Sequence, residues 1–255
     1  MAPPPTPTPA PPPPVPGPAR RPARRPARRA RGLPHLLLAA AVLAAGGLGA
    51  ARGCTTLLAG KGATADGSVL SSHSNDAEGR CDVRLVKIPA AAHPPGALRP
   101  VFKDTESYPR HVGEDRGASE YRPREGQAAS VPIGHIPEVN YTFAYFEETY
   151  GIVNEHQVAA AESTCSGRFT AKAVGYGGRA LLSIDALSRI GLERARTARE
   201  MVQVMGSLAE AHGFYGSSSN FEGGAESLLV FDPQEGWVFH GARARGGGRR
   251  AGDGD

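Results

Sequence analysis

The fold is decided by residues 54–72, which read Cys54-Thr-Thr-Leu-Leu-Ala-Gly-Lys-Gly-Ala-Thr-Ala-Asp-Gly-Ser-Val-Leu-Ser-Ser72. Residues 54–59 favour a β-strand, and Asp66-Gly67 is a dipeptide typical of a tight hairpin turn. Residues 69–72 are then the returning strand. The sequence therefore predicts a β-hairpin that begins at Cys54.

Elements of the same kind are predicted further along the chain. Alternating or clustered apolar residues predict strands over 83–88, 141–146 and 151–161, and a hairpin over 227–240. The intervening residues 89–139 are rich in Pro, Gly and charged residues, and we interpret them as a long surface excursion.

Two helices are predicted between these strands. Residues 181–192 carry apolar residues at helical spacing. Thr197-Ala-Arg-Glu200 is a capping box, and it predicts a helix that ends near Gly213. Strands followed by helices and then strands indicate a mixed α+β layered fold, because a doubly wound fold would alternate the two.

Charge divides the chain into three segments. Residues 1–53 hold eight Arg and no acidic residue, and residues 241–255 hold four Arg and much Gly. Residues 54–240 carry 17 basic and 23 acidic side chains. A mildly acidic body argues against nucleic acid as a partner, since such binders present a basic face to the phosphates. Its length suits one domain.

The N-terminal segment, residues 1–53, is predicted to be a leader. A Pro- and Arg-rich stretch precedes an apolar run that starts at Leu33 and ends in small residues just before Cys54, which is typical of a secretory signal. The alternatives are a signal anchor, an organelle transit peptide or a start codon placed too far upstream. We expect a secreted protein, or one in an endomembrane or lysosome-like lumen, without stable membrane insertion after processing.

The C-terminal segment, residues 241–255, has no apolar pattern and is predicted to be disordered. The hairpin before it would end in an apolar edge strand with nothing beside it. We therefore expect the chain to stop before its domain does.

Cys54 is the strongest candidate for chemistry among the three cysteines, Cys54, Cys81 and Cys165. It stands where a removable leader meets the first strand. Once cleavage exposes it, one residue supplies both a thiol nucleophile and a free α-amine that can act as general base. Cys81 and Cys165 are then left free to pair or to remain thiols.

Other kinds of site find little support. The eight His show no ligand spacing with Cys or carboxylates, so no metal site and no cofactor are predicted. Residues 175–178, Gly-Tyr-Gly-Gly, lack the Lys-Ser/Thr of a phosphate loop and are interpreted as a turn. The chain also has no Gly-x-Ser-x-Gly elbow of a serine hydrolase.

The segment that opens with Cys54-Thr-Thr-Leu-Leu-Ala resembles the start of the mature chain in cysteine dipeptidases of the PepD/secernin group, which are N-terminal-nucleophile (Ntn) hydrolases. The similarity covers residues 54–240. It recurs, in order, at Tyr108-Pro-Arg-His-Val-Gly-Glu-Asp-Arg-Gly117, Pro132-Ile-Gly-His-Ile-Pro137, Tyr150-Gly-Ile-Val-Asn-Glu-His-Gln-Val-Ala159, Glu162-Ser-Thr-Cys165 and Glu226-Ser-Leu-Leu-Val230.

The resemblance implies an αββα four-layer sandwich, here without its C-terminal part, and cleavage of dipeptides through a thioester on Cys54. By analogy with related acylases, the Asp76 carboxylate holds the Cys54 α-amine, and His73 stands where those enzymes have an Arg. Thr164 occupies the position of an oxyanion-hole side chain. An Asn donor and a supporting Arg would belong to the part that follows residue 240.

Two alternatives stay open. An Ntn amidase acting on non-peptide acyl amides would use the same nucleophile. A catalytically inactive scaffold or interaction protein is favoured by His73 in place of Arg and by the early end of the domain. Exposure of Cys54 by cleavage separates the enzymatic hypotheses from the non-catalytic one, because a blocked α-amine cannot act as base.

Overall fold

The computed structural model describes five stretches of the 255-residue chain: 54–76, 81–103, 105–166, 171–216 and 224–241. The predicted leader and residues 242–255 of the predicted tail lie outside the described residues, so what was inferred for them stays a prediction. Within the described stretches, no helix is both long and apolar enough to cross a membrane.

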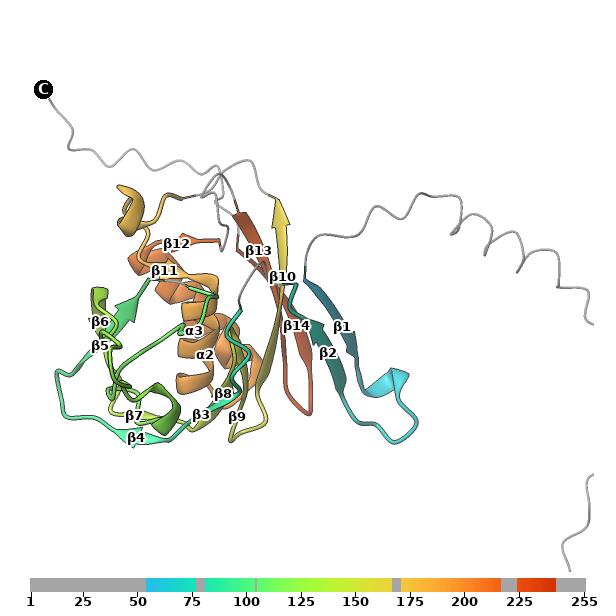
Figure 1. The fold of residues 1–255 in the computed structure, drawn as a ribbon. Helices are drawn as coiled ribbons and strands as arrows, with labels where there is room; N and C mark the ends of the chain where they lie inside the picture. Colours follow the sequence, from blue (N-terminus) through green and yellow to red (C-terminus); the bar gives the residue numbers. More distant parts are fainter. Residues whose placement is uncertain (1–53, 77–80, 104, 167–170, 217–223, 242–255) are drawn as a thin grey trace, which may run out of the picture. The chain divides into compact units, whose positions relative to one another are not determined.

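The main element is a six-stranded antiparallel sheet in the order β14-β13-β10-β9-β8-β3 (Figure 1). Its strands are β3 (Val86–Ile88), β8 (Tyr145–Glu147), β9 (Gly151–Asn154), β10 (Ala159–Ser166), β13 (Gly224–Phe231) and β14 (Gly236–Gly241). The β10–β13 ladder runs along the whole of both strands, whereas β9 pairs with β10 only at Ala159. The second hairpin is thereby confirmed. The predicted strand over 83–88 forms only at Val86–Ile88, 141–146 is divided between β8 and a short strand of another sheet, and 151–161 is divided into β9 and β10.

Helices α2 (Ile184–Arg194) and α3 (Ala198–His212) cover one face of this sheet (Figure 1). The Ser183 side chain caps α2 by accepting a hydrogen bond from the Ala186 N–H, and Thr197 caps α3 through the Glu200 N–H, as the capping box predicts. The two helices approach closely at Gly191, where an added Cβ would lie 2.9 Å from Met201.

The core lies between the helices and the sheet. It contains fully buried side chains from α2, from α3, from β13 and from the loops around them. The largest of the aliphatic ones are Leu182, Ile184, Leu187, Ile190, Leu192, Met201, Met205 and Leu228. Burying each such side chain contributes roughly 1.5–3 kcal/mol.

The first hairpin consists of β1 (Thr55–Ala59) and β2 (Leu70–Ser74), and it lies on the sheet face opposite the helices (Figure 1). Gly67 in its turn has a φ of +76°, a conformation that glycine adopts without strain. The Leu58 side chain sits over Gly236 of β14, where an added Cβ would come within 2.4 Å of it. The predicted hairpin is confirmed, and it rests on the large sheet.

Residues 89–139 differ from the prediction of a surface excursion. They include short elements and buried anchors, Val101, Tyr121 and Ile136, that join the main core. These elements are β4 (Ala91–Ala92), β5 (Leu98–Phe102), η2 (Ser119–Tyr121) and β6 (Pro132–Pro137), followed by β7 (Tyr141–Thr142). The prediction was wrong because widely spaced apolar residues give no periodicity, yet each fills a place in the core.

Charged side chains also hold this region in place. Arg116 pairs with Glu147 at 2.5 Å, and Arg99 forms a two-pronged pair with Glu193 at 2.7 and 2.8 Å. Tyr121 donates a 2.6 Å hydrogen bond to Glu147. Burial alone would raise the pKa of Glu147, but Arg116, Arg189 and the tyrosine hydroxyls hold it at about 2. The network borders a cavity of about 400 Å³.

The remaining described elements are small: η1 (Lys61–Ala63), η3 (Val174–Tyr176), β11 (Leu182–Ser183) and β12 (Phe214–Tyr215). Gly177 ends η3 in the left-handed conformation, so the Gly-rich stretch is a turn, as predicted. Together the elements confirm a mixed α+β class. The four-layer sandwich stays a prediction.

Candidate active site

Cys54 immediately precedes β1 and is brought to the end of β2 by the hairpin register. Because Thr55 pairs with Ser74, Cys54 lies beside Asn75 and Asp76. The Thr55 N–H donates to the Ser74 hydroxyl at 3.1 Å. The Cys54 carbonyl oxygen accepts a 2.9 Å hydrogen bond from the hydroxyl of Ser163 on β10. The candidate nucleophile is therefore fixed both to its own hairpin and to the large sheet.

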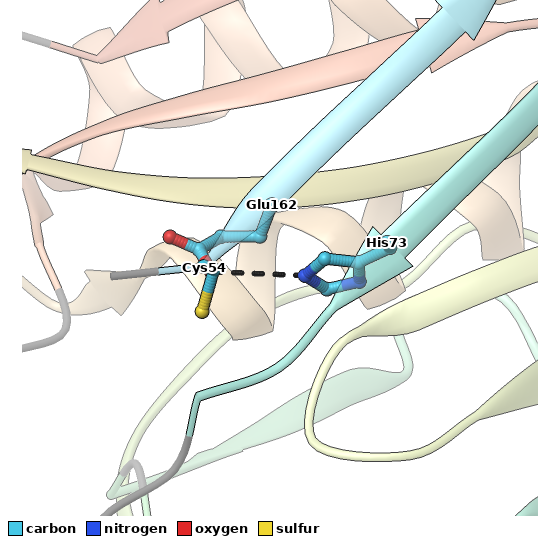
Figure 2. A group of neighbouring side chains, drawn as sticks. All are labelled: Cys54, His73 and Glu162. Carbon is cyan, nitrogen blue, oxygen red and sulfur yellow. Dashed lines mark ion pairs between the residues drawn. The ribbon is translucent and has the colours of Figure 1, made fainter. Parts of the chain in front are cut away.

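Three side chains from three strands converge at this point (Figure 2). Cys54, His73 of β2 and Glu162 of β10 each direct one sulfur, nitrogen or oxygen atom into a group whose members all lie within 4.8 Å of one another. His73 Nε2 is 4.0 Å from Glu162 Oε2. The spacing argument from the sequence predicted no such cluster, because residues 54, 73 and 162 meet only through strand pairing.

The surroundings of the Cys54 thiol oppose its ionisation. Burial raises its pKa, and the carboxylates of Glu162 and Asp76 raise it further. A hydrogen bond from the Asp76 backbone N–H acts in the opposite direction, and the pKa comes to about 12. The thiol also donates to Asn75 Oδ1 across 3.8 Å. In this chain, with Cys54 still joined to residue 53, the sulfur is protonated at neutral pH.

His73 supplies no positive charge at neutral pH. Burial lowers the pKa of its imidazole more than the nearby Glu162, Glu148 and Asp76 raise it, so the ring is neutral at pH 7. The side chain is 22% exposed, and its ring packs edge-on against Tyr150 at 5.9 Å between centroids. His73 thus lies beside Cys54, where sequence reasoning put it, as a neutral group.

Glu162 is the residue that sequence reasoning missed. Its side chain is fully buried on β10, next to the buried Ala159–Ala161. Glu162 Oε1 accepts a 2.6 Å hydrogen bond from the Thr164 hydroxyl, whereas Oε2 is buried without a hydrogen-bond partner among the described residues. A carboxylate that follows three alanines in a buried strand was the available signal, because such a group needs a functional or structural reason.

Thr164 and Asp76, the other two predicted site residues, lie in the same region. Thr164 directs its hydroxyl to Glu162. Asp76 acts on Cys54 through its charge and its backbone N–H. Whether Thr164 receives an oxyanion or Asp76 holds an α-amine stays a prediction.

The neighbouring polar groups are structural. Asn75 Nδ2 donates to Glu148 at 3.3 Å. The buried Asn154 amide donates to the carbonyls of Leu192 and Ala195, while its oxygen accepts from two backbone N–H groups. Asn154 is therefore a turn and packing residue.

All three cysteines are free thiols, so Cys81 and Cys165 do not pair. Cys165 is exposed and lies 3.8 Å from the Ser227 hydroxyl, which in turn contacts His240 Nδ1 at 2.7 Å. Cys54 alone of the three stands at the convergence of β1, β2 and β10.

One comparison with known proteins bears on this arrangement. The family model described as Peptidase family C69 matches residues 53–239. The match begins one residue before Cys54 and spans all three side chains of the cluster, both helices, and the sheet except for the last two residues of β14.

Proposed function

The chain belongs to peptidase family C69, and from that premise we propose that it is a cysteine-type dipeptidase whose nucleophile is the thiol of Cys54. Peptidase activity on small peptides follows from the family. The placement of Cys54 at the junction of three strands, with its carbonyl fixed by Ser163, carries the finer proposal.

The electrostatics of the uncleaved site oppose formation of the nucleophilic thiolate. Because burial and the neighbouring carboxylates raise the thiol pKa of Cys54 to about 12, the thiolate is scarce at pH 7. The charged groups that act on the sulfur, Glu162 and Asp76, are both acidic. Among the residues that the structure describes, no charged group that acts on the sulfur is cationic, so forming the thiolate needs further activation by a positive charge or a base.

Removal of the residues before Cys54 would supply both. The freed α-amine accepts the thiol proton, and the resulting ammonium lies among the carboxylates that otherwise oppose ionisation. The sulfur then attacks the carbonyl of the N-terminal residue of the dipeptide, forming a C–S bond. The C–N bond breaks, and the proton leaves with the C-terminal amino acid. Water hydrolyses the thioester, with the amine acting as base again.

A secretory leader would provide the cleavage, and we propose a secreted or luminal location on that basis. The substrates would be dipeptides, in keeping with the family, and the carboxylates around Cys54 would favour substrates that carry a free α-amine. The same nucleophile would serve an amidase, so the choice between them depends on substrates.

The test is to express the full chain in a secreting host and to determine the N-terminal residue of the mature protein by mass spectrometry. A dipeptide panel and a panel of non-peptide acyl amides are then assayed with the wild type, Cys54→Ala and Cys165→Ser. We expect a start at Cys54, hydrolysis of dipeptides, loss of activity in Cys54→Ala and retention in Cys165→Ser. A mature chain that retains residues before Cys54, or an active Cys54→Ala variant, would refute the proposal.

A further inference from the structure

The cluster of Cys54, His73 and Glu162 combines the three donor types that zinc-like cations use in proteins: a sulfur, an imidazole nitrogen and a carboxylate oxygen (Figure 2). Three such ligands with an open fourth position form a common zinc arrangement. The donors come from different strands, so the hairpin and β10 together define the site.

The geometry is close to what such an ion requires. Tetrahedral zinc with bonds of about 2.0–2.3 Å places its ligand atoms roughly 3.3–3.6 Å apart. In the structure all three donor atoms lie within 4.8 Å of one another, and His73 Nε2 and Glu162 Oε2 are 4.0 Å apart. Contraction by up to roughly 1.5 Å, within the reach of side-chain rotation, completes the triangle.

Glu162 gives an independent reason to expect a cation. Its side chain is fully buried, and Oε2 faces His73 without any hydrogen-bond partner in the described chain. Leaving a buried carboxylate oxygen unsatisfied is unfavourable, because the oxygen has lost its hydration without gaining a partner. One ring nitrogen of His73 is available as a ligand, because a neutral imidazole has a lone pair on the nitrogen that carries no proton.

We propose that Cys54, His73 and Glu162 form a binding site for a thiophilic divalent cation such as Zn²⁺, and that occupancy blocks Cys54 reversibly. Binding replaces the S–H bond with a metal–sulfur bond and releases one proton to solvent, without any change of oxidation state. The inhibitory consequence rests on the proposed function, in which Cys54 is the nucleophile. The binding itself does not.

The experiment measures binding directly and uses no turnover. The full chain is titrated with Co²⁺ alone, and the thiolate-to-cobalt charge-transfer absorption is followed; Zn²⁺ alone is then added as competitor. The variants are Cys54→Ala, His73→Gln and Glu162→Gln. The matched control is Cys165→Ser. It removes an exposed thiol from β10, the strand that also carries Glu162, at a position close to His240.

We expect one Co²⁺ per chain, displaced by Zn²⁺, in the wild type and in Cys165→Ser. In each site variant the Co²⁺ affinity should fall further than the roughly 10- to 100-fold loss that is typical when an outer-shell partner is removed. Absence of the charge-transfer band, its survival in Cys54→Ala or its loss in Cys165→Ser would overturn the proposal. So would unchanged affinity in His73→Gln and Glu162→Gln.

A second measurement uses only the wild-type chain, so it tests the site even where a variant fails to fold. Zn²⁺ should slow the alkylation of Cys54 by iodoacetamide, followed by peptide mass spectrometry, and leave Cys165 unaffected. Equal protection of both thiols, or of neither, would contradict the site. An inactive protein that binds Co²⁺ refutes only the dipeptidase function, and an active one that does not bind refutes only the cation site.

Discussion

The Ser163 hydroxyl donates a 2.9 Å hydrogen bond to the carbonyl oxygen of Cys54, a residue 109 positions earlier in the chain. Cys54 precedes the hairpin, and Ser163 lies within the longest ladder of the large sheet. This single bond links the candidate nucleophile to the part of the molecule that holds the core.

Ser163→Ala should loosen Cys54 without unfolding the domain. Losing this hydrogen bond should lower the free energy of unfolding by about 1 kcal/mol, as measured by urea denaturation. In the mature protein kcat should fall while Cys54 remains the alkylated residue. Ser72→Ala, which changes an exposed serine of β2, serves as control and should leave both quantities unchanged. Equal kcat in the two variants would show that the bond does not position the nucleophile.

Cys54 should react more slowly than Cys165 in the uncleaved chain. Because burial and the carboxylates of Glu162 and Asp76 raise the thiol pKa of Cys54 to about 12, its thiolate is scarce at pH 8. Cys165 is exposed. The measurement is the rate of iodoacetamide labelling at each residue from pH 7 to pH 10, with a tenfold rise per pH unit expected for Cys54. Rapid labelling of Cys54 at pH 7 would contradict the electrostatics described above.

His73→Arg should lower the pKa of the Cys54 thiol by about 1–3 units, since a permanent positive charge close to the sulfur favours the thiolate. The pH at which Cys54 labelling accelerates should shift down accordingly. His135→Arg places the same charge at an exposed position of β6 and is the control. If the two variants give identical labelling profiles, His73 does not act on the thiol.

Glu147 should make the fold sensitive to acid. Its pKa is about 2 in the folded chain and 4.5 ordinarily, so its contribution is complete above pH 4.5 and is lost as the pH falls towards 2. The difference corresponds to about 3 kcal/mol. Glu147→Gln should lose roughly that much stability in urea at pH 7 and much less at pH 3. Glu114→Gln, at an exposed acid, should change neither value.

Local signals in the sequence predicted the local structure well. The Thr197-Ala-Arg-Glu200 cap and both hairpins formed where the sequence indicated, but the first hairpin closes through residues 60–69 and not through a tight turn at Asp66-Gly67. These features depend on residues a few positions apart, so the sequence contains all that determines them. The family resemblance, which rests on several motifs in a fixed order, is confirmed by the match over residues 53–239.

Long-range features were not accessible in the same way. Glu162 joins Cys54 and His73 only because β10 meets the hairpin, and no spacing rule encodes that encounter. In the polar stretch of residues 89–139, Tyr108 and Tyr121 were the expected anchors; Tyr121 is buried, but Tyr108 is exposed and Ile136 is buried in its stead. The buried pairs of Arg99 with Glu193 and of Arg116 with Glu147 likewise bring together residues far apart in sequence.

Because the hairpin contacts β10, the order in which the chain is synthesised determines when the site can form. Cys54 is synthesised early, but the strand that carries Ser163 and Glu162 emerges more than a hundred residues later, and β13 must follow before the β10 ladder is complete. The site therefore assembles only after nearly the whole described chain has been made. A nascent chain that misfolds before this stage therefore keeps Cys54 apart from both Ser163 and Glu162.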